Sequence, residues 1–578
     1  MPDSISKIIY ELNNKNFKKA LKLCEKYSEN NNLHILNNLK GIIFINLKDH
    51  PKAIKYFQKS INHKEDYLEG YSNLASAYFS IKNYSKSINT IIKALNYDPK
   101  NQNLHFNLAF FFSENSQYQK AVEQYNKAMK FGYNKEIVLN NIGNIYIKEK
   151  NYSKAEEYFL ECLKISSSNY LTINNLIRSL ILKRAFAEAE KYQKLSDKLE
   201  IKNNIYFINK AELLFFSKKY EEAKNVLKEF CKKNKNDIGS YISLSLIYSS
   251  LGEFNNSYKL IEEAYKLNPT HNTLKLIHSM NLLKQGNFKE GWKLYDRSLQ
   301  IKDNYYSNIP FWKGEDLKKK KILVYEDQGI GDSIQFSKLL FSLSKICNDI
   351  RIEVRNSALS LFQKNVLNLK AFKKGSNLNS DCDYKISFVS LNTFFYENKN
   401  KKEEVFFKID KEIISKCRNK FNSKNLKVGL TWSGNTYGVN QPFRSIELKK
   451  LDKILSLDCE FICLQNDIWD SDQNYLNNSK INNLGNNNFL EIAAIIKNLD
   501  LVISVDTSIL HLSSSLDKLT WGLFSFDQEW RWWSYNKPPF YKKLIEYKQI
   551  QFDSWDHVLN NVFKDLKKMV DNKNHIKI

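Results

Sequence analysis

The chain has 578 residues, of which 42% are hydrophobic. This length exceeds what one core organises, because single hydrophobic cores stop growing near about 250–300 residues, so we expect at least two structural units. No stretch approaches the roughly 20 apolar residues that cross a bilayer, and the first twenty residues lack the apolar run of a signal peptide. We therefore expect a cytoplasmic protein.

The net charge of +25 arises from 88 Lys and Arg residues against 63 Asp and Glu residues. The basic residues are mostly lysines spread along the chain, which predicts a solvated surface rather than a specific nucleic-acid site. Peripheral contact with an anionic membrane surface, or an acidic substrate, stays open. The eight cysteines are scattered without a CxxC pair, so we expect free, buried thiols and no cysteine metal site.

A period of 34 residues, after a first step of 33, runs through residues 1–300. A small side chain lets two antiparallel helices approach closely, and each helical hairpin leaves an apolar face that only the next hairpin covers. The pattern predicts an α-solenoid whose curved surface binds a peptide or protein. The small residues that mark the period are Ala20, Ala53, Ser87, Ala121, Ala155, Ala189, Ala223, Ser257 and Gly291.

The helical period stops after Leu299, and residues 301–320 are predicted to be a connector because they contain Pro310, Gly314 and four consecutive lysines. From Lys321 onward, short runs rich in Val and Ile alternate with helical segments, which predicts parallel sheets covered on both faces. Two groups of such runs indicate two Rossmann-like lobes, residues 321–410 and 411–578. The expected strands are 321–325, 351–354, 427–432, 460–464, 501–505 and 519–524.

The first chemistry-bearing loop, residues 326–336 (EDQGIGDSIQF), follows the first expected strand. Gly329 and Gly331 permit a tight turn and a close approach of backbone to a ligand at a helix start. Asp332 stands at that helix start. Either it caps the helix, or it is a general base in the cleft where ligands of parallel sheets bind.

The second loop follows the strand at 427–432 and contains residues 431–435 (TWSGN). Gly434 permits a tight exit from the strand. Arg444, a few residues further on, is either an ordinary surface arginine or a bidentate ligand of a phosphate.

The third loop begins after the strand at 501–505. Hydroxyl groups and backbone N–H groups of Asp506, Thr507 and Ser508 at the start of a helix are typical of a phosphate cradle. His511, one turn into that helix, either orients the loop or contacts a ligand. Residues 529–533 (EWRWW) are either a core plug or a segment that covers the cleft.

Together these segments resemble a tetratricopeptide array fused to a heptosyltransferase-like glycosyltransferase domain of family 9. They are more distantly similar to the TPR-bearing protein O-GlcNAc transferases of family 41. The resemblance covers nearly the whole chain. It rests on the repeats, on the end of the last hairpin (residues 288–297), and on residues 326–336, 431–435, 444–446, 461–465, 500–512 and 529–533.

The resemblance implies a two-lobed GT-B fold and a nucleotide-sugar donor held mainly by the C-terminal lobe. It also implies an inverting transfer of a hexosyl or heptosyl group with no metal or other cofactor, so that the acidic triplets 381–383 and 470–472 are accidental. Asp332 then matches the catalytic aspartate, Arg444 a diphosphate contact, and Gln465 a nucleoside contact. The donor-binding set is Gly329, Gly331, Gly434, Asn435, Arg444, Gln465, Asp506, Thr507, Ser508 and His511.

The leading hypothesis is a glycosyltransferase whose solenoid positions a protein or glycan acceptor. The alternative is a catalytically inactive adaptor, in which the glycosyltransferase-like domain serves as a binding module. A nucleic-acid-binding function is motivated by net charge alone.

Overall fold

The structure is a computed structural model, and it describes residues 2–27, 32–295, 308–376, 381–396, 405–421, 424–434, 444–527, 530–533, 541–552 and 554–575. The chain divides into two compact units, Met1–Asn209 and Lys210–Ile578. The second unit therefore contains the last repeats together with the α/β region. The predicted domain boundaries at residues 300, 320 and 410 stay predictions.

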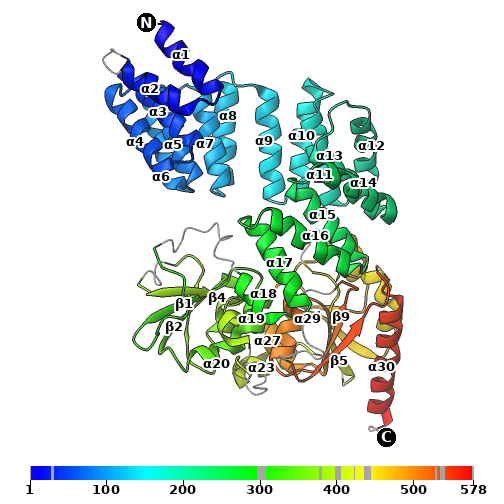
Figure 1. Cartoon of the computed structure of the whole chain (residues 1–578). Helices are drawn as coiled ribbons and strands as arrows, with labels where there is room; N and C mark the ends of the chain where they lie inside the picture. Colours follow the sequence, from blue (N-terminus) through cyan, green and yellow to red (C-terminus); the bar gives the residue numbers. More distant parts are fainter. Residues whose placement is uncertain are drawn as a thin grey trace. The chain divides into compact units, whose positions relative to one another are not determined.

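The first unit is built from helices that pair successively into antiparallel hairpins, and the predicted helical solenoid is confirmed (Figure 1). These helices are α1 (Pro2–Asn13), α2 (Phe17–Lys26), α3 (Leu33–Asn46), α4 (His50–His63), α5 (Leu68–Ser80), α6 (Tyr84–Leu95), α7 (Gln102–Glu114), α8 (Tyr118–Lys130), α9 (Lys135–Lys148), α10 (Tyr152–Ile165), α11 (Tyr170–Lys183) and α12 (Phe186–Asp197). Helix α13 (Asn204–Phe216) spans the division between the units.

Each small residue of the 34-residue period lies in the second helix of a hairpin and is buried. Gly291 in the last hairpin shows why the residue must be small, because an added Cβ there would lie 2.7 Å from Cδ2 of Leu283 in the preceding helix. Five residues before each small position, the turn between the two helices has a positive φ, for example 60° at Lys82 and 78° at Gly252. This left-handed position was not predicted, because lysine occupies it in most repeats and gives no turn signal.

The second unit continues with the remaining repeat helices. They are α14 (Tyr220–Lys233), α15 (Ile238–Ser250), α16 (Phe254–Leu267), α17 (Asn272–Lys284) and α18 (Phe288–Leu294). Apolar residues of the last hairpin, including Leu283 and Trp292, share one hydrophobic core with the first sheet of the α/β region. The end of the repeat array is therefore part of the same folded body as the sheets.

Two parallel sheets form the α/β region, as predicted from the two groups of apolar runs. The first sheet has the order β3-β2-β1-β4 and the second the order β10-β9-β8-β5-β6-β7. The strands are β1 (Lys321–Tyr325), β2 (Asp349–Val354), β3 (Lys370–Lys373), β4 (Tyr384–Ser387), β5 (Leu426–Thr431), β6 (Cys459–Cys463), β7 (Asn482–Asn483), β8 (Leu501–Val505), β9 (Thr520–Phe524) and β10 (Leu544–Lys548).

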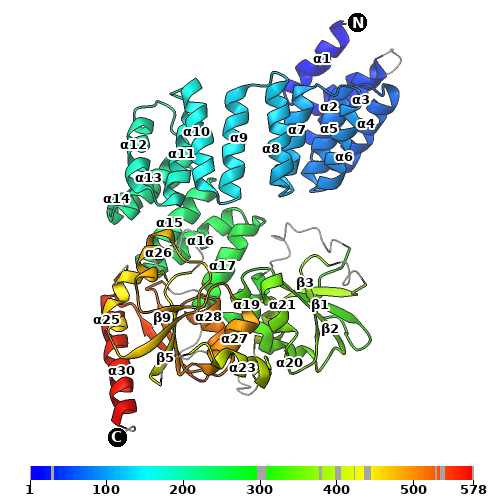
Figure 2. The same ribbon diagram turned by 180° about the vertical axis from the view of Figure 1, so that it is seen from behind.

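Helices connect and cover these strands, and Figure 2 shows α30 and α25 side by side near the second sheet. The α/β helices are α19 (Ile330–Phe336), α20 (Leu340–Leu343), α21 (Asn356–Phe362), α22 (Asn392–Phe395), α23 (Lys411–Arg418), α25 (Asp452–Leu455), α26 (Asp470–Asn477), α27 (Phe489–Asn498), α28 (Ser508–Ser515), α29 (Trp530–Trp533) and α30 (Asp556–His575).

The second sheet has the strand order of a doubly wound nucleotide-binding fold, in which successive strands are added on one side of the first strand and then, from the fourth strand on, on its other side. The first and fourth strands are β5 and β8, which lie side by side. In such sheets ligands bind beyond the carboxyl ends of the strands at this change of side. The topology therefore predicts a ligand site at the loops after Thr431 and after Val505.

Candidate functional site

The loops after β1, β5 and β8 line one cavity of about 540 Å³. Every predicted site residue that the structure describes lies on its wall, namely Gly329, Gly331, Asp332, Gly434, Arg444, Gln465, Asp506, Thr507, Ser508 and His511. Asn435 lies outside the described residues. Residues up to 182 positions apart in sequence thus meet at one place, because parallel strands end at the same edge of their sheet.

Asp332 lies in the first turn of helix α19. One oxygen accepts a hydrogen bond of 3.1 Å from the backbone N–H of Gly329, so the carboxylate does cap its helix. The other oxygen forms an ion pair of 2.5 Å with Nε of Arg531, from helix α29. Both side chains are close to fully buried, with 13% and 9% of their surface exposed. Capping therefore does not remove Asp332 from the cavity.

Gly331 lies where helices α19 and α28 cross. A Cβ atom at this position would lie 3.0 Å from Cδ2 of His511 and 3.4 Å from Cα of Ser508. The glycine therefore permits a close approach of the loop after β1 to the loop after β8. This role differs from the predicted contact of backbone with a ligand, which stays a prediction.

His511 is buried in α28 and orients the residues around it. Its Nδ1 atom shares a hydrogen bond of 2.9 Å with the Tyr541 hydroxyl, and its ring stacks on Trp532 at 5.1 Å. Burial, together with the nearby Arg531 and Arg444, lowers the pKa of His511 to about 3. The imidazole is therefore neutral at physiological pH and cannot serve there as a cation for a diphosphate.

Asp506, at the carboxyl end of β8, accepts a hydrogen bond of 2.9 Å from the indole of Trp532. Ser504 and Thr507 are bonded to each other through their hydroxyl groups at 3.1 Å. Helix α28 follows immediately, so that its first backbone N–H groups stand at the cavity wall. Such groups attract anions, which is the electrostatic basis of the predicted phosphate cradle.

Gln465 follows β6 and holds the loop after β5. Its Oε1 atom accepts hydrogen bonds from the backbone N–H groups of Trp432 and Ser433, at 3.0 and 3.2 Å. Its Nε2 atom donates to Ser433 Oγ at 2.9 Å and to the Asp467 carbonyl at 3.0 Å. The amide is thus occupied by the protein, and its predicted contact with a nucleoside stays a prediction.

Asp381 and Asp472, one from each of the acidic triplets 381–383 and 470–472, contact other residues of the fold. Asp381 pairs with Lys321 at 2.8 Å and with Arg351 at 2.5 Å. Asp472 is buried and accepts hydrogen bonds from the indole of Trp432 at 3.0 Å and from the backbone of Leu448 at 3.2 Å. The expectation that neither triplet binds a metal stays a prediction.

Gln328, Arg355 and Arg531 also line the cavity, although they were not among the predicted site residues. Arg531 donates to Gln328 Oε1 at 2.8 Å, and Gln328 in turn donates to the Tyr295 hydroxyl. Arg355 donates to Glu326 at 2.5 Å. The available signal was the arginine placed between tryptophans in residues 529–533, but only the tertiary structure brings it to Asp332.

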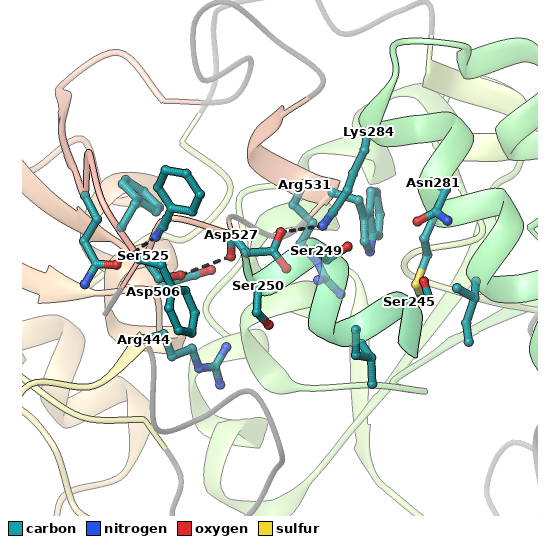
Figure 3. Close-up of a pocket in the computed structure, with 18 of the residues that line it drawn as sticks. Ser245, Ser249, Ser250, Asn281, Lys284, Arg444, Asp506, Ser525, Asp527 and Arg531 are labelled. Carbon is teal, nitrogen blue, oxygen red and sulfur yellow. Dashed lines mark hydrogen bonds and ion pairs between the residues drawn. The ribbon is translucent and has the colours of Figure 1, made fainter. Parts of the chain in front are cut away.

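A second cavity, of about 320 Å³, adjoins the first and shares Gln328, Arg444, Asp506 and Arg531 with it. Figure 3 shows polar residues of α15 and α17, such as Ser249, Asn281 and Lys284, across from residues that follow β9. Lys284 and Asp527 join the two sides through an ion pair of 2.8 Å. The last repeats therefore form one wall of a space that leads to the Asp332–Arg531 pair.

Models of known families match both parts of the chain. Tetratricopeptide repeat models match residues 68–101, 91–123, 137–169 and 238–271. The model described as glycosyltransferase family 9 (heptosyltransferase) matches residues 466–557. The chain joins tetratricopeptide repeats to a glycosyltransferase family 9 region. Residues 466–557 contain the loop from Asp506 to His511 and also Arg531, whereas Asp332 and Arg444 precede this matched segment.

The tetratricopeptide repeats have solved structural relatives. Pseudomonas aeruginosa PilF is 16% identical, with 36% of this chain and 94% of that chain covered and a TM-score of 0.31. A tetratricopeptide repeat protein from Parabacteroides merdae is 13% identical, with 43% and 98% covered and a TM-score of 0.37. The Cut9–Hcn1 hetero-tetramer of the APC/C is 15% identical, with 48% and 55% covered and a TM-score of 0.34. No curated protein matches the sequence.

None of the described helices is both long and apolar enough to span a membrane.

Proposed function

We propose that the family 9 region is an active glycosyltransferase that takes its sugar from a nucleotide-sugar donor. The observation that carries the proposal is the convergence of Asp332, Arg444, Arg531 and the start of α28 on one cavity. The paired parallel sheets support a GT-B arrangement, in which the donor lies beyond the carboxyl ends of β5 and β8. A hexosyl or heptosyl group is the transferred sugar.

In the proposed reaction, Asp332 accepts the proton of an acceptor hydroxyl while the hydroxyl oxygen attacks the anomeric carbon. The bond from that carbon to the diphosphate oxygen breaks, and the nucleoside diphosphate leaves with the electron pair. One displacement from the opposite face inverts the anomeric configuration. Arg444 and the backbone N–H groups at the start of α28 stabilise the departing charge without a metal.

The acceptor is proposed to enter through the second cavity. Its walls combine apolar side chains of α15 and α17, such as Leu246 and Met280, with buried amides. Within the described part of the chain, neither Asn281 Nδ2 nor Gln549 Nε2 has a hydrogen-bond partner. A buried donor without a partner costs about 1–3 kcal/mol, so both amides favour an acceptor that supplies oxygen atoms, in a protein or a glycan.

The eight free thiols support a reducing compartment, and we place the reaction in the cytoplasm.

The donor is identified by thermal unfolding in the presence of UDP-, ADP- and GDP-sugars, with and without EDTA. We expect one nucleotide class to raise the unfolding midpoint, with no loss on chelation, and slow hydrolysis of that donor by the wild-type protein. Asp332→Ala is expected to abolish hydrolysis and transfer while the protein stays folded. Binding without turnover in the wild type would favour the inactive adaptor, and no binding across the panel would refute both.

The acceptor route is tested with Asn281→Leu and Gln549→Leu. We expect the KM for the acceptor to rise about tenfold or more, the equivalent of one lost hydrogen bond, while donor hydrolysis in water is unchanged. Equal losses of both reactions would contradict the separate acceptor route.

A further inference from the structure

Arg531 makes an ion pair with the carboxylate that the proposed reaction uses as its base. The distance from Nε to the Asp332 oxygen is 2.5 Å, and both side chains are close to fully buried. A second contact, to Gln328 Oε1 at 2.8 Å, holds the guanidinium at the loop after β1. A carboxylate paired with a guanidinium in a poorly hydrated site is a weak proton acceptor, because the cation favours its ionised form.

The same guanidinium lines the cavity where the donor diphosphate is proposed to lie. Arginine binds phosphate oxygens as readily as carboxylate oxygens and often in a bidentate way. A bound diphosphate and Asp332 therefore compete for the guanidinium of Arg531. Arg444, on the same wall, adds to the positive charge but comes from a different loop.

The two residues that flank Arg531 in helix α29 fix the position of its backbone through contacts with other elements. The preceding Trp530 packs against Trp292 at 5.4 Å and against Phe336 at 6.3 Å. The following Trp532 is bound to Asp506 at 2.9 Å. A change of partner by Arg531 therefore needs movement of its side chain only, not of the helix.

We propose that Arg531 is a donor-gated clamp on Asp332. Without a donor the guanidinium holds the carboxylate and keeps it from accepting a proton. When the diphosphate of the nucleotide sugar binds, it neutralises and attracts the guanidinium, and Asp332 becomes available to the acceptor hydroxyl. The inference rests on the proposed function and adds an order to it: the donor binds first, and the base is active only in its presence.

The test measures binding of pyrophosphate and of UDP, ADP and GDP by isothermal titration calorimetry to the full chain. Arg531→Gln is expected to weaken binding about tenfold or more, the equivalent of one charge-assisted hydrogen bond. Asp332→Asn removes the competing charge but retains an oxygen for the Gly329 N–H group, and it is expected to tighten binding several-fold. In the variant that combines Asp332→Asn with Arg531→Gln, the gain in affinity from Asp332→Asn should vanish, because that gain acts through Arg531.

Asp506→Asn is the matched control, because Asp506 is a carboxylate of the same cavity that Trp532 holds. Its effect on affinity is expected to be the same with Arg531 or with Gln at that position. A gain from Asp332→Asn that persists in the Arg531→Gln background would mean simple charge repulsion and would overturn the clamp. Binding by the wild type with no gain in Asp332→Asn would overturn the clamp but not the proposed function. Absence of binding to any probe by every variant, with folding verified by circular dichroism, would overturn both.

Discussion

The imidazole of His511 shows how a single buried side chain links the cavity to stability. It lies between Tyr541 and Trp532, and burial lowers its pKa from 6.5 to about 3. The packing around the loop after β8 therefore requires the imidazole to be neutral. Because the ring does not titrate near neutral pH in the folded protein, His511 contributes no ionisation near pH 6–7 to the pH profile of the proposed activity.

The same pKa predicts a loss of stability in acid. Below pH 6.5 the unfolded chain protonates this histidine, whereas the folded chain does so only near pH 3, so the free energy of unfolding falls as the pH decreases between these values. The contribution is at most about 5 kcal/mol, from 1.36 kcal/mol per pKa unit. His511→Asn is expected to flatten the decrease of the urea midpoint between pH 6.5 and pH 4. His557→Asn, at an exposed position of α30, is the control and should leave the slope unchanged.

At the scale of elements, the last hairpins of the solenoid are joined to the family 9 region by specific contacts. The turn at Gly252, between α15 and α16, lies against Phe526, which follows β9. Lys284 pairs with Asp527 close by. The repeats in this unit thus contact Phe526 and Asp527, which follow β9.

Two glycines at the same turn position allow the energy of the Phe526 contact to be distinguished from the energy of backbone strain. Gly252 and Gly286 both have a φ of 78°, but an added Cβ would lie 2.5 Å from the Phe526 ring at Gly252 and would have open space at Gly286. Alanine at either position costs about 1 kcal/mol for the left-handed backbone, and at Gly252 about 1–3 kcal/mol more for the displaced ring. Urea unfolding followed by tryptophan fluorescence measures the difference, since all nine tryptophans lie after residue 291. Equal losses would show that the Phe526 contact has no energetic weight.

At the scale of the whole molecule, the compact unit that contains the cavity begins inside the repeat array, at Lys210. Trp292 and Tyr295 of the last hairpin pack against Trp530 at 5.4 and 5.8 Å, and Tyr295 also accepts a hydrogen bond from Gln328. The family 9 region therefore depends on the end of the solenoid for part of its core and for the placement of Arg531.

Two fragments test this dependence. A fragment of residues 203–578 keeps the hairpins from α13 onward and is expected to unfold near the midpoint of the full chain. A fragment of residues 301–578 loses the burial of Trp530, worth about 2–3 kcal/mol for a large aromatic side chain, and is expected to unfold about 10 °C lower or to aggregate. Tryptophan fluorescence during heating makes the comparison, and equal midpoints would contradict it.

Elements with a local or periodic signal were predictable from the amino-acid sequence. The small residues from Ala20 to Gly291 predicted the helical hairpins, because helix contact requires small size at a fixed spacing. Continuous apolar runs predicted the strands buried on both faces, such as β1 and β8. Strands β3, β4, β7 and β10 were not predicted, because they are short or mix polar residues with apolar ones, and pairing with a neighbour rather than composition makes them strands.

The residues that each loop contacts depend on the packing of distant parts of the chain. The loops that carry Asp332, Arg444 and Asp506 were singled out from glycines and polar residues after apolar runs, and their convergence follows from the parallel topology. The ion pair between Asp332 and Arg531 could not be predicted from the parallel topology, because the two residues are about 200 positions apart in sequence. Arg531 reaches the carboxylate because its neighbours Trp530 and Trp532 pack against other parts of the fold. A local pattern specifies which residues stand at a strand end, whereas the charge that a buried carboxylate faces depends on how distant helices pack.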